Sequence, residues 1–171
     1  MSTIVDGNSG GTVITNSTYT PGMVIQVVNY LTGAVATGTG AIPFDDTIPQ
    51  NTEGSEYMTL AITPKSATSQ LKIEVIFYGG NGTANNWTVV AMFQDSGVNA
   101  IASGYGYVPN INASIPTVFT HYMVSGTTSS TTFKVRAGIN GGGTLTFNGA
   151  GAARRMGGVL SSSITITEIA Q

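Results

Sequence analysis

Alternation of apolar and polar residues recurs along this chain, whereas the three-to-four-residue spacing of an amphipathic helix does not. In residues 71–77 (LKIEVIF) the odd positions are apolar, while Lys72 and Glu74 face the other way, which predicts a half-buried strand. Residues 133–137 (FKVRA) repeat this pattern. Turn sequences rich in Gly, Pro, Asn and Ser separate further strands, which are predicted at residues 23–31, 57–63, 87–95, 98–102, 117–125, 144–148 and 162–169.

About nine strands at short spacing, with no helical segment between them, predict an all-β fold. Consecutive strands this close together pair in antiparallel fashion, so we expect an antiparallel β-sandwich of the jelly-roll type. This domain is expected to span residues 21–171.

Residues 1–20 differ from the rest, because they are almost wholly Gly, Ser, Thr and Asn and end at Pro21-Gly22. We expect them to form an extended N-terminal arm that attaches to another protein. The arm's apolar residues come in pairs, which suits a segment that adds a strand to a neighbour. A frayed terminus explains the same composition equally well. The candidate attachment residues are Ile4, Val5, Val13 and Ile14.

Two predicted strands are apolar on both faces. Residues 24–28 (VIQVV) form one of them, and residues 89–93 (VVAMF) form the other. An isolated sandwich would expose one of these faces to water, whereas a subunit packed around a symmetry axis buries both. Charged residues make up only 8% of the chain, against about 25% in an ordinary globular domain. Both observations predict an obligate homo-oligomer.

The charge and cysteine content exclude several classes of function. Six basic and eight acidic residues give a net charge of −2, and the basic residues are scattered, which disfavours nucleic-acid binding. Cysteine is absent, which excludes disulfides, thiolate metal sites and a cysteine nucleophile. No apolar run approaches the length that spans a bilayer, and residues 1–11 do not resemble a secretion signal. We therefore expect a protein that does not insert into a membrane.

Candidate catalytic and metal-binding residues are few. His121 is the single histidine and lies within a predicted strand without a nucleophile motif, which favours a structural or interface role. An acidic loop places Asp45, Asp46, Glu53 and Glu56 within twelve residues. Hard cations such as calcium bind clustered oxygens, but this spacing matches no calcium loop, so a solvated or interface loop is favoured and no metal is assigned. A two-carboxylate glycosidase would use the same residues, but no aromatic cleft accompanies them in the sequence.

Two other segments have ordinary explanations. Residues 138–143 (GINGGG) lack the Lys and hydroxyl residue that follow a phosphate-binding loop, so they predict a hairpin or loop and no cofactor. Arg154 and Arg155 are the only basic pair. They could meet an acidic patch on another subunit or an anionic glycan, although a solvated pair is the default interpretation.

Two segments have the composition of recognition loops, in which rigid aromatic rings stack on sugar faces and Asn side chains supply hydrogen bonds. They are residues 78–87 (YGGNGTANNW) and residues 104–110 (GYGYVPN). A core position for Trp87 at the start of a strand is the alternative interpretation. The candidate receptor-binding residues are Tyr78, Asn81, Asn85, Asn86, Trp87, Tyr105, Tyr107 and Asn110.

Several segments together point to a known family. They are residues 45–75 (DDTIPQNTEGSEYMTLAITPKSATSQLKIEV), 90–95 (VAMFQD), 126–129 (GTTS), 132–138 (TFKVRAG) and the closing 163–169 (SITITEI). This set resembles the small β domains of tailed-bacteriophage virion surface proteins, which are found at the distal part of tail fibres or as short standalone proteins. The resemblance covers roughly residues 21–170. Its motifs belong to the scaffold, so no catalytic residue is carried over.

The resemblance implies a homotrimeric jelly-roll-like sandwich on a virus particle that is assembled in the cytoplasm of a bacterial host. Its partners would be other phage virion proteins of the tail or the capsid. The chain departs from a full fibre because it lacks a long repetitive shaft and a large tail-docking domain. A location on the phage head, gripped by the first 20 residues, therefore stays open.

We therefore expect a non-enzymatic virion structural protein, a tail-fibre-like module that recognises the host cell surface through exposed loops. A surface glycan is the candidate receptor. The alternative is a capsid decoration, cement or head-spike protein that binds and stabilises the phage head through its N-terminal arm. A carbohydrate-active enzyme that uses Asp45 or Glu53 is a third hypothesis with less support.

Overall fold

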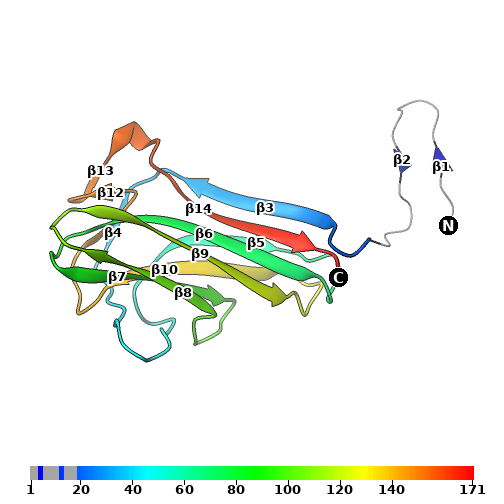
Figure 1. Ribbon diagram of the computed structural model, residues 1–171, viewed down its shortest axis with the longest axis horizontal. Helices are drawn as coiled ribbons and strands as arrows, with labels where there is room; N and C mark the ends of the chain where they lie inside the picture. The colour runs from blue at the N-terminus through cyan, green and yellow to red at the C-terminus, as the bar shows by residue number, and fades with distance from the viewer. Residues whose placement is uncertain (1–3, 6–11, 14–18) are drawn as a thin grey trace.

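The computed structural model describes residues 4–5, 12–13 and 19–171, which consist of strands, turns and one short 3-10 helix, η1 (Met156–Gly158) (Figure 1). No helix in this part of the chain is long and apolar enough to cross a membrane. Eight strands of seven to twelve residues build the body of the molecule. They are β3 (Val24–Thr32), β5 (Ser55–Ile62), β6 (Gln70–Asn81), β7 (Asn86–Gln94), β8 (Ala102–Val108), β9 (Ser114–Val124), β10 (Thr131–Ile139) and β14 (Ser162–Ile169).

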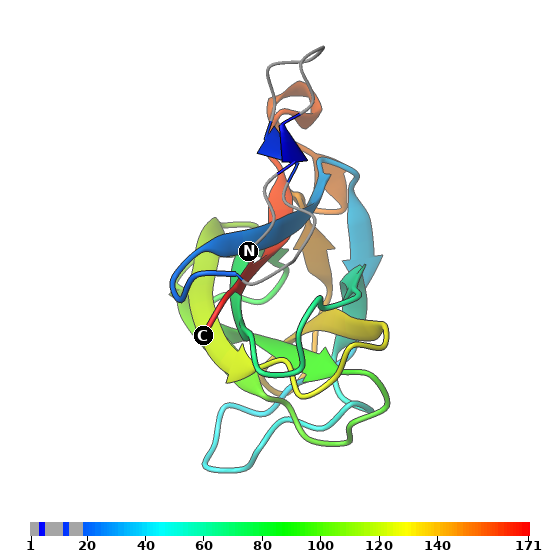
Figure 2. The same cartoon turned by 90° about the vertical axis from the view of Figure 1, so that its right-hand side faces the viewer.

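These eight strands form two antiparallel sheets, seen as separate layers in Figure 2. The first sheet has the order β3-β14-β6-β9, and the second has the order β5-β10-β7-β8. Counted along the chain from one to eight, these orders are 1-8-3-6 and 2-7-4-5. Only β7 and β8 are consecutive long strands within one sheet, so every other connection crosses between the sheets. This is the double Greek key of a jelly roll, and the predicted all-β, jelly-roll-like sandwich is confirmed.

Short strands extend this framework. β11 (Leu145–Phe147) pairs with the last residues of β6, beyond those that pair with the start of β14, and β4 (Ala36–Gly38) pairs with β11. β12 (Gly149–Ala150) and β13 (Ala153–Arg154) form a small hairpin after β11. The first sheet is therefore continued by short strands beside the second half of β6.

The main core lies between the two sheets. Alternation on β6 turns Leu71, Ile73, Val75 and Phe77 inward, and all four are buried. The inward faces of β7, β10 and β14 add Val90, Met92, Phe133, Val135, Ala137, Ile139, Ile164 and Ile166, and β5 and β11 add Met58, Ile62, Leu145 and Phe147. Burial of these side chains is the main source of stability in a chain without disulfides.

A second, smaller core explains why β7 is apolar on both faces. Residues 39–54 fold over the outer face of the second sheet, and Ile42 packs there against Val89, Ala91 and Phe93 of β7. Hydrogen bonds at 2.8–2.9 Å between residues 49–51 and 98–100 fix the segment in place. The inference that β7 needs a second subunit to cover it is therefore wrong. The outward Val24 and Val27 of β3, by contrast, are exposed.

The strand register shows which turns share an end of the sandwich. Gln70 at the start of β6 pairs with Val124 of β9 and Ile169 of β14, so the turns 63–69 and 125–130 lie together. The backbone N–H of Gly22 donates to the carbonyl of Ala170 at 2.8 Å, so residues 1–22 join the domain at this end, the arm end. Residues 82–85, 109–113 and 140–144 lie at the opposite end, the distal end (Figure 1).

One predicted strand and one predicted loop differ from the structure. The strand predicted at residues 98–102 is wrong, because residues 98–101 form a turn that bridges to Gln50, and β8 starts at Ala102. As a result, Tyr105 and Tyr107 lie on a strand and not in a loop.

The arm was expected to be extended, and two short pieces of it are described. β1 (Ile4–Val5) pairs with β2 (Thr12–Val13), with Ile4 opposite Val13. Ile14 lies outside the described residues. Attachment through these residues stays a prediction.

Candidate functional site

Four aromatic side chains form a cluster on the outer face of the second sheet, near the distal end. We call Phe44, Trp87, Tyr105 and Tyr107 the aromatic strip. Trp87 on β7 pairs with Tyr107 on β8, and Tyr105 lies two residues before Tyr107 on the same face of β8. Phe44 comes from the segment 39–54 that folds over this face. Three sequence-distant segments therefore meet at one site.

The rings of the strip are packed against one another. The ring centroids of Phe44 and Trp87 are 4.3 Å apart with an interplanar angle of 16°, which is a stacked pair. Tyr105 lies 4.8 Å from Phe44 and 5.5 Å from Trp87, and Tyr107 lies 4.9 Å from Trp87. Tyr105 is nevertheless 60% exposed and Tyr107 is 44% exposed. The strip is thus pre-arranged and open to solvent.

The alternation of glycine with tyrosine on β8 places these rings. Gly104 and Gly106 face the interior, where β9 crosses, and a Cβ on Gly106 would lie 2.1 Å from Cδ1 of Ile115. A larger side chain at either position would have to displace side chains of β9. Tyr105 and Tyr107 occupy the outward positions for this reason.

Asparagine side chains hold the strip in place. The backbone N–H of Phe44 donates to Oδ1 of Asn140 at 3.1 Å, and Nδ2 of Asn86 donates to the carbonyl of Asn140 at 2.8 Å. The hydroxyl of Tyr107 donates to Oδ1 of Asn85 at 3.2 Å. Asn85 and Asn86 were predicted as receptor-binding residues, and the structure gives their side chains hydrogen bonds that position the neighbouring segments.

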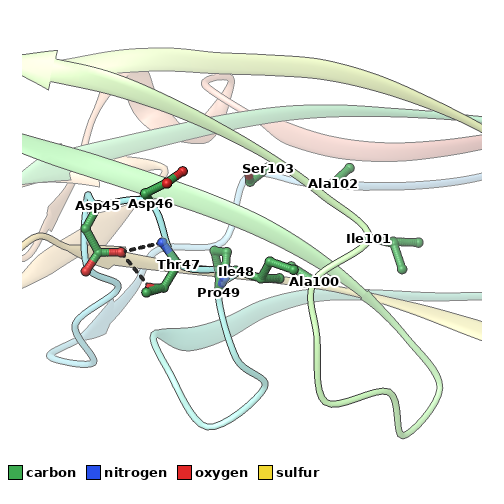
Figure 3. Close-up of a pocket in the computed structure, with 9 residues that line it drawn as sticks. All are labelled: Asp45, Asp46, Thr47, Ile48, Pro49, Ala100, Ile101, Ala102 and Ser103. Carbon is green, nitrogen blue, oxygen red and sulfur yellow. Dashed lines mark hydrogen bonds between the residues drawn. The ribbon is translucent and has the colours of Figure 1, made fainter.

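A shallow pocket of about 320 Å³ continues the strip toward the arm end (Figure 3). Residues 45–49 and 100–103 line it, and Ser103 lies two residues before Tyr105 on the outward face of β8. The carboxylate of Asp45 accepts hydrogen bonds from the hydroxyl and the backbone N–H of Thr47, at 2.5 and 2.9 Å. These bonds, the one from the hydroxyl first, lower the pKa of Asp45. The pocket therefore presents negative charge beside the aromatic rings.

The other predicted receptor-binding residues do not belong to the aromatic strip. The prediction for Asn81 is wrong, because its side chain is fully buried, donates to Oγ1 of Thr88 and accepts from the N–H of Thr83. Tyr78 is half-buried on the outer face of the first sheet. Asn110 is exposed in the turn between β8 and β9 at the distal end. Phe44 was not predicted, because nothing in its local sequence shows that residues 39–54 fold onto β7.

The acidic loop does not gather its carboxylates. Glu53 accepts from the backbone N–H of Gln50 at 2.9 Å, and Glu56 forms an ion pair with Arg136 at 3.6 Å. In the described part of the chain, no three His, Asp or Glu side chains come together as a metal site would require. His121 is half-buried on β9, opposite Ile73 of β6. Arg154 and Arg155 are exposed.

No protein-family model and no curated protein matches the sequence. Among solved structures, the chain is similar to two titled as infectious bursal disease virus, Gt strain (TM-score 0.37) and Gx strain (0.38), and to that virus's VP2 subviral particle (0.35). Sequence identity is 11% in each case, and 98% of this chain is covered. The chain spans 40–42% of the length of these matched chains. At these TM-scores, the similarity carries no argument about function.

Proposed function

We propose that this chain is a bacteriophage virion structural protein that acts as a tail-fibre-like, homotrimeric receptor-binding module, and that its aromatic strip binds a glycan of the host cell surface. The virion setting rests on the sequence resemblance of residues 21–170. The binding role rests on the geometry of the strip.

The observation that carries the binding role is that the packed rings of the aromatic strip are exposed to solvent. Burial of an aromatic side chain removes a large apolar area from water and is therefore favourable in free energy. Exposed apolar patches mark binding surfaces. The apolar C–H faces of a sugar ring stack on such rings, while the hydroxyl of Tyr107 and the carboxylate of Asp46 can hydrogen-bond to sugar hydroxyls. The strip is fixed by Asn140 and by strand pairing, so little conformational entropy is lost on binding.

The position of the strip relative to the chain termini supports the same role. Residues 1–22 join the sandwich at the arm end, whereas Trp87 and Tyr107 lie at the ends of their strands nearest the distal end. A protein attached to a virion through its first residues would therefore present the strip away from the particle.

We further propose that the module is non-enzymatic. Asp45 and Glu53, the carboxylates considered for catalysis, each accept hydrogen bonds within their own loop. A general acid must instead deliver its proton to a substrate oxygen. A binding site that uses the strip needs no such group.

The test is binding of the purified full-length chain to host cells and to polysaccharides from the host envelope. Tyr105→Ala removes the most exposed ring of the strip, and we expect at least a tenfold loss of affinity, which corresponds to about 1.4 kcal/mol. Val159→Ala is the control, because Val159 is exposed in the turn before β14, away from the strip. Equal binding by wild type and Tyr105→Ala would contradict the proposal. Binding to purified capsids without binding to host cells or polysaccharides would also contradict it.

A further inference from the structure

The outer face of the first sheet exposes apolar side chains along its whole length. We call this surface the β3–β9 face, after its two edge strands (Figure 1). Residues 39–54 cover the outer face of the second sheet, but among the described residues no segment covers the β3–β9 face in this way. Its exposed apolar residues are Val24, Val27, Leu31, Ile76, Val118, Tyr122 and Val124.

Cross-strand register arranges these side chains in rows. Val27 lies in one row with Thr167, Lys72 and Tyr122, and Leu31 lies in another with Ser163, Ile76 and Val118. Most of the bulky apolar residues stand on the two outer strands, with Ile76 on the central strand β6, and the other central strand, β14, contributes mainly small hydroxyl residues. The face is therefore broad, and its charged side chains are limited to the Lys72–Glu74 pair on β6, so it can pack against another flat surface.

The β3–β9 face carries fewer charged side chains than the second sheet and its loops. The β3–β9 face carries only Lys72 and Glu74, which form an ion pair at 2.9 Å and cancel each other. The second sheet and its loops carry Lys134, Arg136, Glu56 and Asp95 around a single pocket. Charged residues are depleted at the centres of protein interfaces. The charge pattern therefore points to the β3–β9 face as the one that is buried in an assembly.

The edge strands support this assignment. β3 is the edge of the first sheet and contains nine residues without a charge, so no charged side chain on it discourages pairing of its outer N–H and C=O groups. β9, at the other edge, contains eleven residues and no Asp, Glu, Lys or Arg. Monomeric proteins protect long apolar edges with charges, prolines or bulges. Only Pro116 on β9 and the bulge at Glu168/Ile169 opposite β3 serve here.

The size of the face is adequate for a stable contact. Four strands about 4.8 Å apart and about ten residues long, at about 3.3 Å per residue, cover roughly 600 Å² of flat sheet. Side-chain relief adds to this area, and stable interfaces bury about 800 Å² on each partner. The Lys72–Glu74 pair is neutral overall, so another copy packed on this face meets no net charge.

We propose that the β3–β9 face is the surface through which copies of this chain bind one another. The inference assigns a contact surface to the homotrimer of the proposed function and does not depend on what the aromatic strip binds. The aromatic strip lies on the opposite sheet, so self-association leaves it open to a ligand.

The test compares two valines of nearly equal exposure by sedimentation velocity of the full-length chain at micromolar concentration. Val118 on the β3–β9 face is 61% exposed, and Val98 in the turn between β7 and β8 is 59% exposed. We expect wild type and Val98→Lys to sediment as an oligomer and Val118→Lys as a monomer, with at least a hundredfold weaker self-association. Far-UV circular dichroism and thermal unfolding establish that each variant is folded.

A charge exchange gives a second measurement that a folding defect does not imitate. Lys72→Glu places two like charges on the face and should weaken self-association at least tenfold, and addition of Glu74→Lys should restore it. A monomeric wild type, an oligomeric Val118→Lys or dissociation by Val98→Lys would each overturn the proposal. Glycan binding by the Tyr105→Ala variant is read separately, so the failure of one proposal is distinguishable from the failure of the other.

Discussion

The hydroxyl of Ser69 donates a 2.6 Å hydrogen bond to the carboxylate of Glu168, and both side chains are buried. The same carboxylate accepts from the backbone N–H groups of Lys65 and Ser66, at 2.8 and 3.1 Å, and from the side-chain amide of Gln26 at 2.6 Å. These donors are all neutral, so the negative charge is stabilised by hydrogen bonds and not by a cation. Glu168 thereby ties the turn 63–69 and strand β3 to β14 at the arm end.

Replacement of Glu168 by glutamine should destabilise the fold. A carboxylate only accepts hydrogen bonds, whereas a glutamine amide must turn one NH₂ group toward these donors. We expect Glu168→Gln to lower the free energy of unfolding by about 2 kcal/mol at pH 7, as measured by urea denaturation. Asp46→Asn is the control, because Asp46 is exposed, and should change it by less than about 0.5 kcal/mol. Equal stability of the two variants would contradict this role of Glu168.

The stability should also fall in acid because of the same carboxylate. Burial is the largest single effect on the pKa of Glu168 and raises it, but the hydrogen bonds from Ser69, Gln26 and the two backbone N–H groups outweigh it and lower the pKa. A carboxyl whose pKa is lower in the folded state stabilises the fold fully above its unfolded value, near 4.5. This contribution is lost as the pH falls from that value through the folded pKa.

Thermal unfolding between pH 7 and pH 3 measures this contribution. The wild type should lose melting temperature below about pH 4.5, and Glu168→Gln, which has no proton to bind at this position, should lose less. Parallel profiles for the two proteins would show that other carboxyl groups cause the acid sensitivity.

The fold was predictable because alternation in residues 71–77 and 133–137 assigns an inner face to two strands. These strands, β6 and β10, are central in the two sheets, and the other strands pair beside them. The same logic failed for β7. Its sequence shows two apolar faces but not that Ile42, nearly fifty residues earlier, covers one of them. Periodicity reports which residues avoid water, and contacts between distant segments decide what covers them.

The candidate site was predictable in the same partial way. Trp87, Tyr105 and Tyr107 were identified by residue type. Trp87 was placed at the border of a recognition loop and a strand, and the two tyrosines were assigned to a loop. The alternation of glycine and tyrosine in residues 104–107 is itself a period-two signal and could have placed both tyrosines on one face of a strand. No comparable signal exists for Phe44, because its position depends on how residues 39–54 cross the sheet. Asn81 has the residue type of a contact residue but is buried.

Trp87 provides a direct optical test of the strip, because it is the only tryptophan in the chain. Phe44→Ala removes the ring stacked on it, so we expect a red shift of tryptophan emission and weaker glycan binding. Stability should fall by only about 1 kcal/mol, since aromatic pairs contribute about that much beyond burial. Val159→Ala should leave the emission unchanged. An unshifted spectrum in Phe44→Ala would mean that the two rings are not stacked in solution.

The backbone contact between β10 and the segment 39–54 should be sensitive to a single methyl group. A Cβ on Gly138 would lie 2.5 Å from the carbonyl oxygen of Gly40 and 2.6 Å from the backbone nitrogen of Ile42. Gly138→Ala must therefore push the segment away from the sheet and open the second core, and such overpacking costs about 1–3 kcal/mol. Phe44 belongs to the same segment, so the emission of Trp87 should shift to the red as well.

Gly141→Ala separates this effect from ordinary glycine replacement. Gly141 has open space around its Cα but a φ of +72°, so alanine there strains only the local turn and costs about 1 kcal/mol. Both variants should lower the midpoint of urea denaturation, but only Gly138→Ala should change the tryptophan emission of the folded protein. If both variants shift the emission equally, the aromatic strip responds to general loosening of the distal end and not to displacement of the segment 39–54.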